Sequence, residues 1–464
     1  MAGFEFGRNP VEVPRVLTQY RRIQTPLPAP GTRELFELLD KYESRSMHGQ
    51  IPIVWDRAED FSVWDRAGNR WIDFTSTIFV ANIGHSNAHV ATALQSAIQK
   101  SLLHSYTYAT DIRARYLQKL VEFTPAQFEK AFLLSSGTEA TECAVKLMHM
   151  QGQKIGKKRN IVVSFEGAMH GRTLAAVMMG GSPASRAWVG RDYPDFSRLD
   201  YPYYWDLEKA GVSGADRFSQ DLETLKSRGI NPATDICGFM LESYVGWSAV
   251  FFPADYVQTL AKFARENGIL LCFDEIQAGF GRTGKMFAYE HYGVEPDMIC
   301  CGKGMSASLP LSGVLGRADI MDLPDVGSMS STHSANPLAC AAGLATIEEM
   351  EQRNLVAESA RKGKILHNAL NGLKSRYPDR ISRVLGKGMV AAIVLVDPKT
   401  GAADADVCNM AAELCMRKGL IVVHTGRESI KFGPPLTIAD EAILEGVSVV
   451  DEALAEALAL RKAA

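Results

Sequence analysis

The chain of 464 residues has no uninterrupted apolar run that approaches the roughly 18 residues needed to cross a membrane. It also lacks an excess of either charge, since 50 Lys and Arg stand against 53 Asp and Glu. This balance gives a nucleic acid or an anionic membrane no electrostatic reason to bind. The first residues carry charges and prolines where a secretory signal needs an apolar core. A cytoplasmic protein is therefore expected.

The cysteines lack the spacing of a metal or disulfide site. Eight are present, several lie inside apolar runs, and none forms a C-x-x-C pair. In a chain of this length the pattern favours reduced, packed thiols. We expect no disulfide framework and no metal site.

Repeats, low-complexity tracts and long charge runs are also absent, and the composition is that of a globular enzyme with one large domain and a smaller one. An amphipathic stretch at 32–44 predicts a helix after a proline-rich arm. The alternating segment 61–74 predicts a β-hairpin around an Ala-Gly-Asn turn. Residues 1–75 are expected to supply this arm, helix and hairpin to the small domain.

Between about 90 and 345, helical stretches alternate with short apolar runs, which predicts an α/β fold with a mostly parallel sheet and helices on both faces. The runs are AFLLSS (131–136), NIVVSFEG (160–167), CGFMLES (237–243), GILLCFDE (268–275) and MICC (298–301). Residues 76–345 are expected to form the large domain. The pattern then changes, and 346–464 are expected to form a smaller α+β domain.

Two charged residues close neighbouring apolar runs. Asp274 ends the run 268–275, and Lys303 follows 298–301 in the turn GKG. Ligands of open α/β sheets gather at the carboxyl ends of the strands, so both side chains are expected at one crevice. An isolated charge there is costly. The two residues therefore either form an internal ion pair or hold a ligand that uses both.

A second candidate is the passage from strand to helix in LLSSGTEATECAVKLM (133–148). Free amides at a helix N-terminus, with the hydroxyls of Ser136 and Thr138 and the open approach at Gly137, suit a phosphate. Ordinary capping, with Glu139 and Glu142 near the positive helix end, explains the same residues.

Three further motifs are weaker. GFGRTG (279–284) matches the dinucleotide fingerprint in letters, but no amphipathic helix follows it, so a structured loop is favoured. AMHGRT (168–173) places Met169 and His170 at a strand end, where a lone histidine is often structural. STHSANP (331–337), with Thr332, is by itself a capping motif before a helix started by Pro337.

Taken together, the phosphate motif, the carboxylate and the lysine are the groups that pyridoxal 5′-phosphate requires. The lysine bonds its aldehyde, the carboxylate keeps its pyridine nitrogen protonated, and amides with hydroxyls hold its phosphate.

At this point the chain resembles the class III aminotransferases of the fold-type I pyridoxal-phosphate enzymes. The likeness covers nearly the whole chain through the hairpin WDRAGNRWIDF, NIGH (82–85), SSGTEATECAVK, MHGRT, FDEIQAGFGRTG, CGKG and THSANPLACAAG. It implies a large domain with a seven-stranded sheet and a small domain built from both termini. It also implies an obligate homodimer with active sites at the interface.

The resemblance assigns roles residue by residue. It implies Lys303 as the cofactor-bonding lysine and proton carrier, Asp274 as partner of the pyridine nitrogen, and Gln277 near the ring hydroxyl. Ser136, Gly137 and Thr138 are expected at the phosphate, with Met169 and His170 beside the cofactor. Thr332 is expected to reach the phosphate from the neighbouring subunit. Ile78 and Glu242 are expected at the substrate, where Glu242 gates substrate charge.

Two departures from the family bear on the substrate. Met169 stands where a ring commonly stacks on the pyridine, and a thioether packs there without ring overlap. Lys431 stands where many members carry an arginine for the substrate carboxylate, and a lysine lacks the planar fork of that side chain. Arg427 lies nearby in sequence as an alternative. We hypothesise that Glu242 and Lys431 form a switchable pair.

The predicted activity is a ping-pong transamination that moves an amino group from an amine or ω-amino acid to a 2-oxo acid, 2-oxoglutarate or pyruvate. An aminomutase, racemase, decarboxylase or phospho-lyase would use the same lysine and aspartate and stays open. A nicotinamide-dependent oxidoreductase resting on GFGRTG is a remote alternative.

Overall fold

The computed structural model describes residues 4–463 of the chain, which divide into two compact units. One unit comprises the residues up to Asn87, the short segment Trp247–Ala249 and the chain from Ala357 onward. The other comprises Ala88–Gly246 and Val250–Val356. The domain limits expected from the sequence, at 75/76 and 345/346, stay a prediction.

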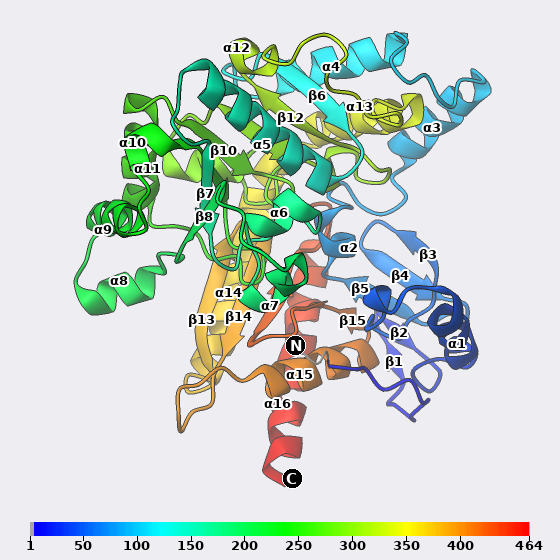
Figure 1. The fold of residues 1–464 in the computed structure, drawn as a ribbon. Helices are drawn as coiled ribbons and strands as arrows, with labels where there is room; N and C mark the ends of the chain where they lie inside the picture. Colours follow the sequence, from blue (N-terminus) through cyan, green and yellow to red (C-terminus); the bar gives the residue numbers. More distant parts are fainter. Residues whose placement is uncertain (1–3, 464) are drawn as a thin grey trace. The chain divides into compact units, whose positions relative to one another are not determined.

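The unit formed by the middle of the chain is built on a seven-stranded sheet in the order β6-β12-β11-β10-β9-β7-β8 (Figure 1). Strand β12 is antiparallel to both of its neighbours, and the other pairings are parallel. The mostly parallel sheet and the seven strands agree with the sequence prediction. Its strands are β6 (Lys130–Leu134), β7 (Ile161–Phe165), β8 (Phe196–Leu199), β9 (Ile236–Glu242), β10 (Leu270–Asp274), β11 (Met298–Cys301) and β12 (Ser312–Gly316).

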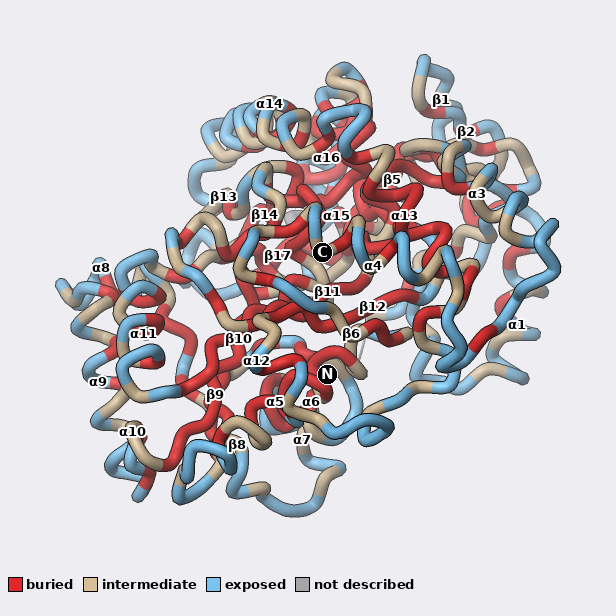
Figure 2. Tube along the Cα trace, turned by 90° about the horizontal axis from the view of Figure 1, so that it is seen from above, coloured by how far each residue is buried: buried red, intermediate tan, exposed pale blue. Residues whose placement is uncertain are grey.

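Helices pack on this sheet because most residues of its strands are apolar and buried, and Figure 2 shows much of the sheet in the colour of buried residues. The helices of this unit are α3 (Ala88–Gln99), α4 (Asp111–Phe123), α5 (Gly137–Lys154), α6 (Leu174–Met178), α7 (Pro183–Arg186), α8 (Tyr204–Ala210), α9 (Gly214–Ser227), α10 (Pro232–Asp235), α11 (Ala254–Glu266), α12 (Ala318–Met321) and α13 (Pro337–Gln352), with short 3-10 turns η2 (Ala187–Val189), η3 (Ala288–Tyr292) and η4 (Lys303–Met305).

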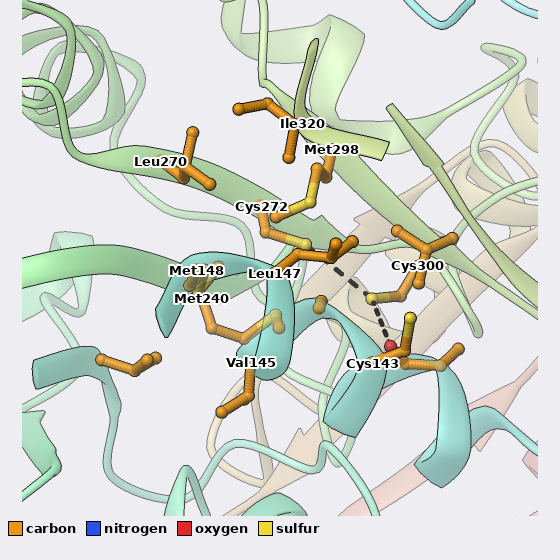
Figure 3. Packing of buried hydrophobic residues seen from close by; sticks show 14 of the residues in the cluster. Cys143, Val145, Leu147, Met148, Met240, Leu270, Cys272, Met298, Cys300 and Ile320 are labelled. Atoms are coloured by element: carbon orange, nitrogen blue, oxygen red, sulfur yellow. Dashed lines mark hydrogen bonds between the residues drawn. The ribbon is translucent and has the colours of Figure 1, made fainter. Parts of the chain in front are cut away.

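Alternate residues of strand β10 show how the two faces are filled. Cys272 joins the apolar cluster beneath helix α5, where its sulfur lies 3.8 Å from the sulfur of Cys300 (Figure 3). The next residue, Phe273, points to the opposite face and packs against the rings of Tyr289 and Tyr292. Both faces are thereby packed, which fixes the end of the strand where Asp274 lies.

The unit formed by the two ends of the chain carries two further sheets. The first has the order β1-β2-β5-β4-β3 with β15 paired to β5, and the second has the order β13-β14-β17-β16. Its strands are β1 (Val16–Leu17), β2 (Arg22–Ile23), β3 (Trp55–Glu59), β4 (Ser62–Asp65), β5 (Arg70–Asp73), β13 (Ile381–Lys387), β14 (Val390–Leu395), β15 (Leu420–Ile421), β16 (Val423–His424) and β17 (Ser429–Phe432).

The helices of this second unit are α1 (Thr32–Tyr42), the 3-10 turn η1 (Arg45–Met47), α2 (Ser76–Phe79), α14 (Leu355–Arg376), α15 (Ala405–Arg417) and α16 (Asp440–Ala463). Helix α1 and the antiparallel pair β4–β5 confirm the helix and hairpin predicted from the N-terminal sequence.

The segment Ser76–Phe79 is an unusual left-handed turn. All four residues have positive φ, between 48° and 69°, although none is glycine. Each such residue costs roughly 1–2 kcal/mol, so the turn persists only because its surroundings hold it. The hydroxyl of Ser76 donates to the carbonyl of Gly433 at 2.6 Å, and the ring of Phe79 lies directly on the same glycine.

Replacing Gly433 with alanine tests this packing. A Cβ there would lie 1.7 Å from Cε1 of Phe79. We expect the variant to lose roughly 1–3 kcal/mol of unfolding free energy, the usual effect of overpacking a core. Denaturant unfolding measures it. The matched control is Gly372→Ala in helix α14, where an added Cβ meets nothing within 4 Å and stability should not fall. Equal stability of both variants would contradict the packing described.

Candidate active site

The carboxyl ends of strands β9, β10 and β11 lie side by side. In the parallel register Asp274 is the partner of Glu242 on β9 and of Cys300 on β11. Lys303 follows the end of β11 by one short turn. One carboxylate from each of two strands and one amine from the third therefore gather at the same edge of the sheet.

The partner of Asp274 is His170. Asp274 is buried, with 5% of its surface exposed, and its Oδ2 accepts a hydrogen bond from Nδ1 of His170 at 2.9 Å. Its Oδ1 accepts from the backbone N–H of Ile276 at 3.1 Å. Because an ionised carboxylate only accepts, Nδ1 carries the proton of the imidazole. Within residues 4–463 no ion pair joins Asp274 to Lys303, so the internal pair considered from the sequence is absent.

Lys303 is held in a strained backbone conformation with φ of 43°. Burial lowers the pKa of its amine, and the carboxylates of Asp274 and Glu242 act in the opposite direction. At any pH below the ordinary lysine pKa, a larger fraction of this amine is therefore neutral than in a free lysine. Only a neutral amine attacks a carbonyl carbon.

This lowered pKa predicts the pH dependence of the protein without cofactor. Below the ordinary lysine pKa the unfolded chain binds the proton of residue 303 more readily than the folded chain does, which disfavours folding. Lys303→Met should therefore be more stable than the wild type at pH 7, and the difference should disappear as the pH rises through the ordinary lysine value. Urea unfolding of both proteins across this range measures it. A constant difference at all pH values would contradict the shift.

The N-terminus of helix α5 is capped in a way that leaves its first residues available. The carboxylate of Glu139 accepts from the N–H groups of Ser135 and Ser136 at 3.0 and 2.7 Å, and from the hydroxyl of Ser136 at 3.1 Å. Gly137 and Thr138 are the first two helical residues, so no preceding turn accepts their N–H groups. Capping by Glu139 therefore leaves the first N–H groups of the helix available.

The loop that carries His170 is fastened to the same helix. Oγ1 of Thr141 donates to the carbonyl of His170 at 2.8 Å, and the hydroxyls of Thr138 and Thr173 lie 2.6 Å apart. Gly171 has φ of 140°, and a Cβ there would lie 2.2 Å from Oγ1 of Thr138. Residue 171 must therefore be glycine for this loop to approach helix α5 so closely. Met169, next to His170, is half exposed.

Ile276 connects the three parts of the site. A Cβ added at Gly137 would lie 2.9 Å from Cδ1 of Ile276. A Cβ added at Gly302, next to Lys303, would lie 3.3 Å from Cγ2 of the same side chain. The phosphate motif, the strand end of Asp274 and the turn of Lys303 are therefore adjacent within one unit.

These residues fit pyridoxal 5′-phosphate. A buried carboxylate oriented by two N–H donors suits a protonated ring nitrogen, and an amine of lowered pKa suits the aldehyde. The helix α5 N-terminus, with a glycine as its first residue, suits the phosphate. The carboxylate of Asp274 is opposite in charge to a protonated ring nitrogen, and the positive end of helix α5 is opposite in charge to a phosphate.

The remaining predicted residues lie in several places. Gln277 is half-buried shortly after β10, and Glu242 is buried, with Oε1 accepting from Gly246 N–H at 3.2 Å. Thr332 is exposed on a loop whose backbone carbonyl is bonded to the imidazole of His104 at 2.8 Å. Ile78, Arg427 and Lys431 belong to the other unit, where Ile78 and part of Arg427 are exposed and Lys431 is buried.

Sequence reasoning missed Glu275, the residue after Asp274. It is fully buried, and its carboxylate accepts from the hydroxyl of Ser243 and from the N–H groups of Ala288 and Tyr289. Burial raises the pKa of Glu275 to about 7. The side chain fixes the segment around Ala288 to the strand end. The sequence signal for this residue was the pair of acidic residues, Asp274 and Glu275, at the end of an apolar run.

Other predictions concern cysteines, metals and membranes. All eight cysteines are free and buried. In the described part of the chain no group of three or more His, Cys, Asp or Glu residues is arranged to hold a metal ion. Among the helices of residues 4–463, none combines the length and apolarity that a membrane span needs.

Comparison with known proteins gives one consistent result. The family model described as aminotransferase class-III matches residues 44–454. A 4-aminobutyrate aminotransferase of Mycobacterium leprae is 32% identical, with 94% of this chain and 99% of that protein covered. An ornithine aminotransferase of Emericella nidulans is 29% identical, with 94% and 93% covered. A solved (S)-enantioselective omega-transaminase from Thermomicrobium roseum is 27% identical with a TM-score of 0.83, with 92% and 98% covered.

Proposed function

Because the chain belongs to the class-III aminotransferases and is thus a pyridoxal 5′-phosphate-dependent transaminase, we propose that its donor is an amine or ω-amino acid. The acceptor is a 2-oxo acid, 2-oxoglutarate or pyruvate, and the two react in turn by a ping-pong mechanism. The observation that carries the proposal is the buried, histidine-bound carboxylate of Asp274 beside the turn of Lys303. Relatives named for 4-aminobutyrate and ornithine support a donor with a terminal amine.

Each residue has a separate part in this proposal. When bound, pyridoxal 5′-phosphate supplies an aldehyde that takes up amino groups and a protonated ring that withdraws electrons. Lys303 would bond the aldehyde, and its amine, when free, would carry the proton of the donor carbon. Asp274, held by His170, would keep the ring nitrogen protonated, and Gln277 would bind the ring hydroxyl. Ser136, Gly137 and Thr138 would hold the phosphate, and the thioether of Met169 would lie beside the ring.

The partner subunit has a part as well. We propose a homodimer in which Thr332 reaches the phosphate bound by the other copy. The exposed position of Thr332 supports this role. Hydrogen bonds also hold its loop to the segment around Leu103, one from His104 and one from the amide of Asn336 to the carbonyl of Leu103 at 2.7 Å. A loop fixed in this way presents an exposed hydroxyl in a constant place.

At the substrate, we propose Ile78 as an apolar contact and Glu242 and Lys431 as the residues that respond to the charge of the substrate. The charge of Glu242 next to the strand partner Asp274 supports its place at the reacting end. The eight free, buried thiols support a reducing compartment, so we propose a cytoplasmic location.

Two measurements test the proposed function. Borohydride reduction of the loaded protein, followed by peptide mass spectrometry, should find the reduced cofactor on Lys303. A panel of amines should then convert the loaded enzyme to its aminated form, and addition of 2-oxoglutarate or pyruvate should yield the matching amino acid in equal amount. Release of carbon dioxide, isomerised amine or phosphate without amino transfer would instead indicate one of the other reactions of this cofactor.

A further inference from the structure

A hollow of about 330 Å³ opens in the unit formed by the middle of the chain, and its lining includes none of the residues proposed for the cofactor or the substrate. Sites of this size hold small molecules. The lining combines small or apolar residues, such as Met178 and Pro183, with one carboxylate, Asp192, and three arginines, Arg186, Arg191 and Arg198. Three guanidinium groups at one hollow indicate a ligand of negative charge.

Arg186 and Arg198 are largely buried and share a single carboxylate. Nη1 and Nη2 of Arg186 donate to the two oxygens of Glu166, both at 2.9 Å, and Nε of Arg198 donates to Oε1 of Glu166 at 3.2 Å. The two arginine side chains are only 10% and 16% exposed. Burial lowers the pKa of Arg198, the charge of Arg186 lowers it further, and Glu166 opposes the shift. One carboxylate therefore serves two positive charges.

Arg198 and Arg191 have N–H groups left for a ligand. Nη1 of Arg198 donates to the carbonyl of Met178 at 2.7 Å, and no described residue accepts a hydrogen bond from its Nη2. Arg191 is exposed, its Cζ lies 4.6 Å from the ring centre of Tyr193, and its Nη2 donates to the hydroxyl of that residue at 2.8 Å. Tyr193 thus orients this guanidinium and leaves its Nε and Nη1 open. Guanidinium N–H groups of this kind suit the oxygens of a phosphate or a carboxylate.

The backbone beside these arginines is held by its own hydrogen bonds. Nη1 of Arg186 donates to the carbonyls of Gly180 and Gly181 at 2.6 and 2.9 Å. The N–H of Gly181 donates to the carbonyl of Ala168 at 2.7 Å, and the carbonyl of Gly181 accepts from the N–H of Gly167 at 3.0 Å. Since this wall of the hollow is already ordered, a ligand loses little affinity to the ordering of the protein.

We propose that this hollow binds a small organic anion that carries a phosphate or two carboxylates, with Arg191 and Arg198 as its charged contacts. The apolar part of the lining accommodates the carbon skeleton of such a ligand, and Asp192 opposes its negative charge. None of these residues has a part in the proposed transamination, so this proposal and the proposed function can fail independently.

Isothermal titration calorimetry of the enzyme loaded with pyridoxal 5′-phosphate tests the site, with glycerol 3-phosphate, inorganic phosphate and succinate as probes. Binding of either phosphate probe identifies a phosphate ligand, and binding of succinate alone identifies a dicarboxylate. Arg191→Gln should weaken binding of the probe roughly 10-fold, as expected for the loss of a charged hydrogen bond. Arg198→Gln should weaken it at least as much. Asp192→Asn should strengthen it about 2- to 5-fold, because it removes an exposed like charge.

The control is Arg159→Gln. Arg159 is an exposed arginine of the same unit that donates to the carbonyl of Gly229 and does not line the hollow. It should leave the affinity unchanged, which separates a local contact from an effect of net charge. If Arg198→Gln does not fold, the two exposed changes, Arg191→Gln and Asp192→Asn, still decide the question. A wild-type protein that binds none of the probes, or binding that both of these variants leave unchanged, would overturn the proposal.

Discussion

Lys303→Ala is expected to lower the rate of amino transfer by at least about 10⁴-fold, the upper end of what a positioned acid–base group contributes. The expected loss is this large because the same amine is proposed both to bond the cofactor and to carry the proton between the reacting carbons. No second amine within the described residues has the combination found here, a lowered pKa at the carboxyl end of the sheet next to Asp274. Single-turnover amino transfer with a saturating donor measures the effect.

The control for this variant is Lys157→Ala. Lys157 belongs to the same unit, and burial lowers its pKa too, but its amine donates to the carbonyls of Ala233 and Asn267. This variant should lose stability and keep its turnover per folded molecule. Adding a small primary amine to Lys303→Ala should restore part of the rate if the missing function is proton transfer. Near-normal turnover of Lys303→Ala without added amine would refute the assignment.

Asp274→Asn is expected to lower kcat by roughly 10²- to 10³-fold, the size of effect that follows removal of one preorganised electrostatic partner. An amide has nearly the same shape and can still accept the hydrogen bond of His170 Nδ1, but it carries no charge to keep a ring nitrogen protonated. The cofactor should therefore remain bound while the reaction slows. Turnover and cofactor content, measured on the same preparation, separate the two effects.

The matching control uses Asp297, a half-buried carboxylate next to this sheet. Asp297 precedes strand β11, accepts from the N–H of Leu271 at 2.8 Å and pairs with Arg317. It lies at the opposite end of the strand from Lys303. Asp297→Asn should reduce stability and leave kcat unchanged. If the two asparagine variants lose the same activity, the loss at Asp274 reflects folding and not chemistry.

Much of the central sheet could be predicted because its strands are continuous apolar runs, such as 268–275 and 298–301, that end in glycine or charge. Strands β8 and β12 were not predicted. β8 is the four-residue segment FSRL, and β12 is SGVLG, in which two glycines remove the side chains that a pattern relies on. Both become strands through pairing with β7 and with β6 and β11, which are distant in sequence.

The candidate site also has parts that could be predicted from the sequence and parts that could not. Asp274, Lys303 and the start of helix α5 could be located because each occupies a fixed place relative to a strand or helix end. The bond between His170 and Asp274 and the packing of Ile276 between two glycines could not. These contacts join residues from separate elements, and no local spacing encodes which of many polar or apolar side chains will meet.

The division of the chain into two units has a consequence for how the enzyme can change. The residues proposed for the cofactor, from Ser136 to Lys303, lie in one unit together with Glu242, and two residues proposed at the substrate, Ile78 and Lys431, lie in the other. Substrate range can therefore drift, or be redirected in the laboratory, through substitutions in the unit of the chain ends alone. Such substitutions would change which substrates react and leave the cofactor chemistry unchanged.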